Sequence, residues 1–396
     1  MTQHFLPDSI FLQNPQMTFL IPALNEEITI GEFVDWCQEG LKNANITGQI
    51  LIIDSSSDNT RKIALQHGAE VLTVEKKGLG RAYIDAIPFV RSQFILMGDA
   101  DLTYDVRHIE GFIEKFNQGY EFILGSRFKG NIEKGAMPLL HRYFGTPLTT
   151  FILNKMFGCH FSDIHCGLRG VTDDALKRMQ LQSQSWQYAS EMVIKAMHLE
   201  LKTSEVPVIF YKDRQGRLSH HKRSGWYAPW VAGWLNLKAM FTYGADFFLS
   251  KVGKLMVIFG LIGTLFLFNG PRTIGAIGFS LHWMLLFLLI FLVGSQLYFM
   301  GFLAKALYDV ESKRLKHCPK FFALDYTIPL AIGSIILGIL SIFPLVKNYI
   351  SMGFRLLTIG SESYHAVGGL GFILFGIIYF TSALLFNAIL LHPSRH

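Results

Sequence analysis

Two aspartates, Asp99 and Asp101, stand one residue apart directly after an apolar run at residues 94–97. A short apolar run of this kind is typical of a buried strand in a parallel sheet. In an open α/β sheet, ligands bind beyond the carboxyl ends of the strands. Two carboxylates at that place can hold a hard divalent cation, and the cation can hold a diphosphate. The pattern therefore predicts chemistry on a nucleotide-activated substrate.

The elements that must position these aspartates alternate along the first 130 residues. We expect strands at residues 17–24, 49–54, 70–74, 94–97 and 122–124, and helices at residues 26–42, 58–67, 79–90 and 106–117. This alternation predicts a mostly parallel α/β sheet that is covered on both faces. Residues 131–210 have a helical pattern that ends in a strand at 202–210. Polar clusters follow three of the strands, at residues 25–26, 54–58 and 99–101, so we expect them to border one crevice.

The second half of the chain is strongly apolar. Of the 396 residues, 50% are hydrophobic and only 17% are charged, which is lopsided for a soluble protein. A helix needs about 20 apolar residues to cross a bilayer. We expect four transmembrane helices at about residues 252–271, 279–304, 326–346 and 367–391. Buried helices of a large soluble protein are the alternative, but four such stretches in succession leave no polar face for water.

The basic residues predict how the chain sits in a membrane. They gather before the first predicted span and between the second and third, so the positive-inside rule places the amino-terminal domain and both termini in the cytoplasm. The net charge of +6 fits a membrane surface, and no basic run interleaved with aromatics indicates a nucleic-acid partner. The four cysteines are scattered and form no zinc pattern.

Three tryptophans, Trp226, Trp230 and Trp234, are spaced four apart and so share one helix face. Because tryptophan prefers the headgroup layer, we expect an amphipathic juxtamembrane helix within residues 225–250. A stripe that faces the core of the soluble domain is the alternative. The expected organisation is a soluble domain at 1–224, the interfacial helix at 225–250 and a transmembrane domain at 251–396.

Several segments together resemble family 2 glycosyltransferases with a GT-A fold, which is a Rossmann-like sheet. In order, they are Pro22-Ala23-Leu24-Asn25-Glu26, residues 54–60, Asp99-Ala100-Asp101 and Gly125-Ser126-Arg127. A later segment resembles the Asp-x-x-Ser/Cys-Gly-x-Arg element of polyprenyl-phosphate glycosyltransferases, the group of dolichol-phosphate mannose synthases and undecaprenyl-phosphate glucosyltransferases. That segment is Asp163-Ile164-His165-Cys166-Gly167-Leu168-Arg169, and the whole resemblance covers about residues 17–240.

The resemblance implies a nucleotide diphosphate sugar as donor. The residues that it assigns to the base and ribose are Pro22, Ala23, Asn25, Glu26 and Asp54. It implies that Asp101 coordinates Mg²⁺ or Mn²⁺ and that Asp99 contacts the ribose or the metal shell. The family usually has two acids and a glycine after the second strand, whereas this chain has a single acid there, Asp54. For Glu26, a favourable charge in the first turn of a helix is the alternative role.

The resemblance also implies a polyprenyl phosphate, undecaprenyl or dolichyl, as acceptor. A phosphate monoester has a second pKa near 6, so it is already a nucleophile at neutral pH and needs cations more than a strong base. The residues expected to contact this phosphate are Arg127, Arg142, Thr146 and, as a mobile lid, Arg214. A surface salt bridge is the alternative for each arginine.

Asp163 is the candidate catalytic carboxylate, and Asp101 and Arg127 complete the predicted catalytic set. For Asp163, capping or pairing with Arg169 is the alternative, and Glu191 is the second choice for the carboxylate.

The function expected from these features is inverting transfer of a hexose from a donor of the UDP-glucose or GDP-mannose kind to a polyprenyl phosphate at the cytoplasmic membrane face. One alternative is a family 2 enzyme with another lipid or a polysaccharide as acceptor. Another is a non-catalytic membrane scaffold, although the intact pair Asp99 and Asp101 argues against it. The sequence leaves open whether the protein is a homo-oligomer.

Overall fold

The computed structural model describes residues 2–7, 14–214, 216, 234, 237–238, 240–308, 322–355 and 359–390. The chain divides into two compact units, Met1–Tyr243 and Gly244–His396. This boundary lies inside the predicted juxtamembrane segment 225–250. Trp234 is exposed, whereas Trp226 and Trp230 lie outside the described residues.

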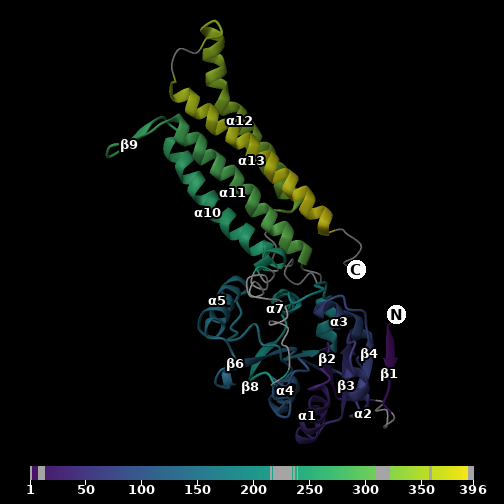
Figure 1. Ribbon diagram of the computed structural model, residues 1–396. Helices are drawn as coiled ribbons and strands as arrows, with labels where there is room; N and C mark the ends of the chain where they lie inside the picture. The colour runs from purple at the N-terminus through teal and green to yellow at the C-terminus, as the bar shows by residue number, and fades with distance from the viewer. Residues whose placement is uncertain are drawn as a thin grey trace. The chain divides into compact units, whose positions relative to one another are not determined.

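The first unit contains an eight-stranded sheet in the order β1-β4-β3-β2-β5-β7-β6-β8 (Figure 1). Its strands are β1 Gln3–Phe5, β2 Met17–Ala23, β3 Gly48–Asp54, β4 Glu70–Thr73, β5 Phe94–Met97, β6 Phe122–Ile132, β7 Arg169–Thr172 and β8 Thr203–Phe210. The pairs β2–β3, β2–β5, β3–β4 and β6–β8 are parallel, while β1 and β7 pair antiparallel with their neighbours. The predicted mostly parallel α/β sheet is therefore confirmed.

The helices of this unit follow the strands in alternation. They are α1 Ile30–Asn43, α2 Thr60–Gln66, α3 Leu79–Ala86, α4 Glu110–Asn117, a π-helical turn at His141–Gly145, α5 Thr146–Phe157, α6 Asp173–Met179 and α7 Tyr188–His198. One core cluster packs α1 and α4 against the sheet, with Phe33 and Phe112 against Phe19, Ile52 and Leu96. All five side chains are fully buried, as expected for a sheet with covered faces.

Several boundaries differ from the prediction for physical reasons. Helix α1 begins at Ile30 rather than at residue 26, because residues 27–29 form a turn. Helix α3 ends at Ala86, before Pro88, whose missing N–H and ring prevent the α-helix from continuing. Strand β6 runs on to Ile132, where it pairs with Phe210 of β8. Strands β1 and β7 were not expected.

Among the residues that the structure describes, the second unit has four helices long and apolar enough to cross a membrane (Figure 1). They are α10 Ala245–Leu267, α11 Leu281–Tyr308, α12 Leu324–Ser351 and α13 Ser361–Leu390. Each overlaps one of the four predicted spans, although α10 begins before residue 252 and α13 before residue 367. An unexpected hairpin, β9 Arg272–Ile274 and β10 Ile277–Phe279, joins α10 to α11.

Glycines bring helices α10 and α11 close together. A side chain at Gly253 would place its Cβ 2.4 Å from the backbone nitrogen of Tyr298, and one at Gly260 would lie equally close to the backbone nitrogen of Phe291. Small residues at such positions let the backbones of membrane helices approach each other. The packing of α10 on α11 thus has the form expected of helices in a bilayer.

Candidate active site

The three polar clusters predicted from the sequence lie at one edge of the sheet. Strands β3, β2 and β5 are adjacent and parallel, and Ala23 pairs with Asp54 at the end of the β2–β3 ladder. The loop that follows β5 carries Asp99 and Asp101. This edge is where an α/β sheet binds its ligands.

The first two loops are tied to each other through Asn25 and Glu26. The backbone N–H of Asn25 donates to Ser56 Oγ at 2.7 Å, and its side-chain Oδ1 accepts the N–H of Ser57 at 2.9 Å. Asn25 has a positive φ of 55°, a conformation that asparagine tolerates better than most residues. The backbone N–H of Glu26 donates to Thr60 Oγ1 at 2.9 Å. These contacts fix the shape of the edge, and any contact of Asn25 or Glu26 with a base or ribose stays a prediction.

Asp54 is the last residue of β3 and is almost completely buried. Its carboxylate accepts the backbone N–H of Ser56 at 3.0 Å. Burial raises the pKa of the Asp54 carboxyl. Pro22 and Ala23 are the last two residues of β2, and Ala23 pairs with Asp54 in the ladder. The structure therefore brings Pro22, Ala23, Asn25, Glu26 and Asp54 to the ends of β2 and β3, whereas Asp99 follows β5.

Asp99 and Asp101 are both partly exposed. The Oδ1 atom of Asp101 accepts two hydrogen bonds from Thr103, from its N–H at 3.0 Å and from its hydroxyl at 2.5 Å. Within the described parts of the chain, no three side chains of His, Cys, Asp or Glu gather to hold a metal ion. Mg²⁺ usually takes one or two carboxylates from the protein and its other ligands from phosphates and water. The two partly exposed carboxylates of Asp99 and Asp101 agree with this way of binding Mg²⁺.

Gly167 connects the aspartate pair to the motif at residues 163–169. Its backbone N–H donates to Tyr104 Oη at 2.8 Å. A Cβ at this position would lie 2.6 Å from Oδ2 of Asp99 and 3.0 Å from the ring of Tyr104. Two segments that are more than 60 residues apart in the sequence therefore meet at Asp99, and only glycine leaves room for the contact.

Substitution of Gly167 by alanine is expected to lower the sugar-transfer activity predicted from the sequence by about 100-fold, because the new methyl group displaces Asp99 and a misplacement of about 1 Å can have that effect. The matched control is Gly333→Ala in α12, where a Cβ meets nothing within 4 Å. Turnover of the two purified variants is the measurement. Wild-type turnover of the Gly167→Ala protein would contradict the assignment of Asp99 to the site.

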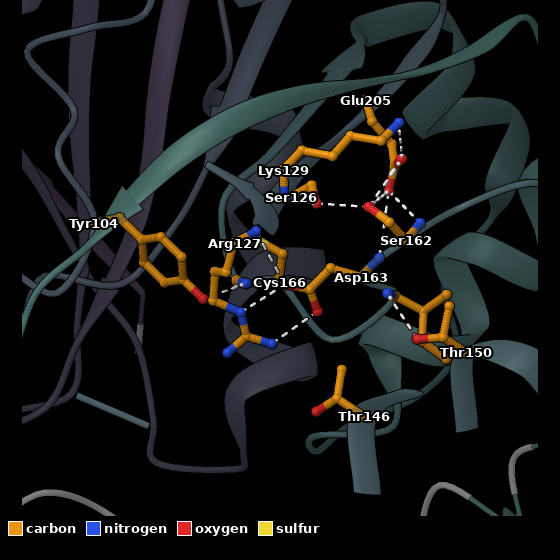
Figure 2. A network of polar contacts seen from close by, with 12 residues as sticks. Tyr104, Ser126, Arg127, Lys129, Thr146, Thr150, Ser162, Asp163, Cys166 and Glu205 are labelled. Atoms are coloured by element: carbon orange, nitrogen blue, oxygen red, sulfur yellow. Dashed lines mark hydrogen bonds and ion pairs between the residues drawn. The ribbon is translucent and has the colours of Figure 1, made fainter. Parts of the chain in front are cut away.

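Arg127 and Asp163 form a buried ion pair, as Figure 2 shows. Nε of Arg127 lies 2.6 Å from Oδ2 of Asp163, Nη2 lies 2.8 Å from Oδ1, and the backbone N–H of Arg127 also donates to Oδ2. Asp163 is fully buried, and Arg127 is 8% exposed. Both oxygens of Asp163 are thus engaged by Arg127, so a positioning role fits this geometry better than that of a base.

The alternative pairing of Asp163 with Arg169 is wrong. Arg169 is fully buried and donates to the backbone carbonyls of Cys166, Ile164 and Ala189. Its guanidinium therefore holds the loop of the motif in shape from within, without contacting the carboxylate.

A second buried carboxylate, Glu205 of β8, holds the same loop from the other side (Figure 2). It accepts the backbone N–H of Ser162 at 2.6 Å and that of Asp163 at 3.3 Å, and it pairs with Lys129 at 2.6 Å. The hydroxyls of Ser126 and Ser162 lie 2.6 Å apart. Sequence analysis missed Glu205, because a single acid in an apolar strand resembles any solvent-facing residue.

Arg142 lies in the π-helical turn and Thr146 begins α5. Thr146 is buried, whereas Arg142 lines a groove of about 610 Å³ together with Lys134 and mainly apolar side chains. Arg214 is exposed and pairs with Glu32 of α1. Arg142 thus lies beside an apolar groove. The role of Arg214 as a lid stays a prediction.

Glu191, the second choice for the catalytic carboxylate, is fully buried in α7. Its oxygens accept the backbone N–H groups of Gln182 and Ser183. The loop held in this way approaches Gly80 so closely that a Cβ there would lie 2.0 Å from the carbonyl oxygen of Ser183. Glu191 therefore shapes a loop that packs on the start of α3.

Comparison with known proteins shows which family the chain resembles. Residues 18–179 match the model of glycosyl transferase family 2. The low-salt glycan biosynthesis hexosyltransferase Agl6 of Haloferax volcanii is 32% identical over 288 residues, which are 72% of this chain and 68% of that protein. The dolichyl-phosphate hexose transferase of the same organism is 27% identical over 205 residues, 50% of this chain and 84% of that protein.

Among solved structures, similarity extends to glucosyl-3-phosphoglycerate synthase from Mycobacterium tuberculosis in complex with Mn²⁺, UDP and glucosyl-3-phosphoglycerate. The identity is 16% and the TM-score is 0.45, with 58% of this chain and 80% of that chain covered.

Proposed function

The chain belongs to glycosyltransferase family 2, and we propose that it transfers a hexose from a nucleotide diphosphate sugar to a polyprenyl phosphate, with inversion at the anomeric carbon. One observation carries the proposal. A single loop, residues 163–169, contacts Asp99 through Gly167 and pairs with Arg127 through Asp163. The carboxylates suited to a metal-bound donor and an arginine suited to an anionic acceptor are thus joined through one segment.

The donor half of the site consists of the edge formed by β2, β3 and β5. Asp101 and Asp99 would hold Mg²⁺ or Mn²⁺, which neutralises the charge of the departing diphosphate. Asp54 and the loops locked by Asn25 are placed to receive the nucleoside. Because Thr103 fixes Oδ1 of Asp101, the direction in which this carboxylate faces is set before the donor binds.

The acceptor half centres on Arg127. Asp163 engages Nε–H and one N–H of Nη2, so both N–H groups of Nη1 and the second N–H of Nη2 can bind a phosphate oxygen. The acceptor phosphate is a dianion at neutral pH, and its oxygen can attack the anomeric carbon without a protein base. Asp163 then acts by holding Arg127, and Arg142 and Thr146 supply further donors to the phosphate.

The surface around Arg142 favours a lipid as the carrier of that phosphate. Several large apolar side chains of the π-helical turn, α5 and the residues just before them are exposed: Leu139, Leu140, Tyr143, Phe144, Leu148, Phe151 and Ile152. An apolar patch of this kind on a soluble unit marks an interaction site. With Lys134 and Arg142 beside it, the surface suits the interface of a bilayer with anionic headgroups.

The four apolar helices of the second unit support a site that works at a membrane. By the positive-inside rule we place the transferase unit and both termini in the cytoplasm. A family 2 enzyme that uses another lipid or a polysaccharide as acceptor is the alternative, and so is a non-catalytic scaffold.

The test is transfer by the purified full chain in detergent with Mn²⁺, radiolabelled nucleotide sugars and either undecaprenyl or dolichyl phosphate. We expect label in the organic phase only when the lipid carries a phosphate and the cation is present. The matched control is the corresponding polyprenol without phosphate. Label that stays in the aqueous phase, or that forms equally with the polyprenol, would contradict the proposed acceptor.

A further inference from the structure

His165 lies inside the motif, between Asp163 and Cys166, and none of the steps above uses it. Its Nε2 atom lies 2.8 Å from the hydroxyl oxygen of Thr149 in α5. The contact joins the loop that holds Arg127 to the helix that begins with Thr146. The role of this contact depends on which of the two groups donates.

The surroundings of Thr149 decide the donor. Its hydroxyl oxygen also lies 2.8 Å from the carbonyl oxygen of Gly145 and 3.1 Å from that of Thr146. A hydroxyl has one proton, and carbonyl oxygens can only accept, so the proton of Thr149 goes to the helix backbone. Thr149 must then accept from His165, which makes Nε2–H the donor.

The charge state of His165 agrees with this arrangement. Burial lowers the pKa of His165 to about 4, and the nearby Arg127, Arg169 and His141 also disfavour a positive ring, whereas Asp163 favours it. The imidazole is therefore neutral at pH 7, with its proton on Nε2. A neutral ring adds no charge beside the Arg127–Asp163 pair.

Other contacts attach the same stretch of chain to α5. The side chain of Asn154 donates to the carbonyl of Phe161 at 2.7 Å and accepts its N–H at 3.2 Å. The N–H of Ile164 faces Thr150 Oγ1 at 3.5 Å, which Figure 2 shows beside Asp163. Polar side chains of α5 thus hold the loop beside the buried Leu153 and Met156, while Leu148, Phe151 and Ile152 on the same helix are exposed.

We propose that His165 is a positioning residue that fixes the Arg127–Asp163 pair relative to Arg142 and Thr146, so that the acceptor phosphate meets both sets of donors at once. The inference rests on the proposed function, because it concerns the phosphate-binding half of that site. It predicts that loss of the hydrogen bond between His165 and Thr149 weakens acceptor binding and leaves donor binding intact.

The experiment is a double-mutant cycle on the full chain, with His165→Leu, Thr149→Val and the double variant. A hydrogen bond contributes about 0.5–1.5 kcal/mol net, so each single change is expected to raise KM for the lipid phosphate about 3- to 10-fold and to leave KM for the nucleotide sugar unchanged. The double variant is expected to be no worse than either single one. His165→Gln, which keeps an N–H at a similar reach, is expected to recover most of the lost affinity.

The control is His108→Leu, at an exposed histidine of the same unit, and melting temperatures report on folding. Additive effects in the double variant, an equal rise in both KM values, or unchanged acceptor KM would each overturn the inference. If His165→Leu fails to fold, the comparison of His165→Gln with Thr149→Val tests the same hydrogen bond. Failure of the wild-type protein to glycosylate any lipid phosphate would instead refute the proposed function.

Discussion

Replacement of Asp101 by asparagine is expected to lower kcat for sugar transfer at least about 100-fold while the melting temperature stays nearly unchanged. Asparagine keeps an oxygen that can accept both hydrogen bonds from Thr103, so the loop after β5 keeps its shape. What is lost is the negative charge that a hard divalent cation requires. Changes that only disturb the surroundings of a metal site already cost 10–100-fold, so loss of a direct ligand has at least the larger effect.

A titration with Mn²⁺ separates metal binding from a general loss of activity. The Asp101→Asn protein is expected to need much more Mn²⁺ to reach half of its own maximal rate. The matched control is Asp174→Asn on α6, where the carboxylate is 77% exposed and pairs only weakly with Arg178 at 3.2 Å. An unchanged Mn²⁺ requirement in Asp101→Asn would refute the assignment of this aspartate to the cation.

The strands that build the donor edge could be predicted because each is a run of apolar residues followed at once by polar ones. The ends of β2, β3 and β5 were expected within one residue of where they lie. Short apolar runs of this kind are typical of strands buried on both faces. Once the strands are parallel and adjacent, the positions of Asn25, Asp54 and Asp99 at one edge follow from the topology.

Strand β7 could not be predicted, and without it the ion-pair partner of Asp163 could not be identified from the sequence. The strand has four residues, includes a glycine and exists because β5 and β6 pair with it from both sides. Gly170 is required there by the rings of Phe112 and Phe116, which come within 3.1 Å of its would-be Cβ. In the sequence Arg169 is the nearest lysine or arginine to Asp163, but β7 carries it toward α7, and the partner is Arg127, 36 residues away.

The role of α5 also could not be predicted from the sequence. Its residues alternate between apolar and polar types, and the usual interpretation buries the apolar side. In the structure Thr149, Thr150 and Asn154 face the loop, and Leu153 and Met156 are buried with them. Other apolar side chains of the same helix, Leu148, Phe151 and Ile152, are exposed. The polar side chains of α5 have hydrogen-bond partners because residues 159–165 lie beside them. A local sequence pattern cannot predict a contact between two segments of this kind.

Replacement of Arg127 by methionine is expected to abolish transfer and to destabilise the transferase unit as well. The change removes the proposed phosphate donor and leaves Asp163 as a buried carboxylate that has lost its cation. Removing one member of a buried ion pair costs about 3–5 kcal/mol. For a unit of this size, that corresponds to a fall in melting temperature of roughly 6–20 °C.

The double variant Arg127→Met with Asp163→Leu separates the two effects. Without the lone buried charge, most of the stability is expected to return, because apolar groups of similar volume often replace a buried ion pair at little cost. Activity is expected to stay absent, since Arg142 and Thr146 do not replace the guanidinium of Arg127 at the acceptor phosphate. Recovery of transfer along with stability would mean that the pair serves only to hold the loop, and that the acceptor phosphate is bound by Arg142 and its neighbours without Arg127.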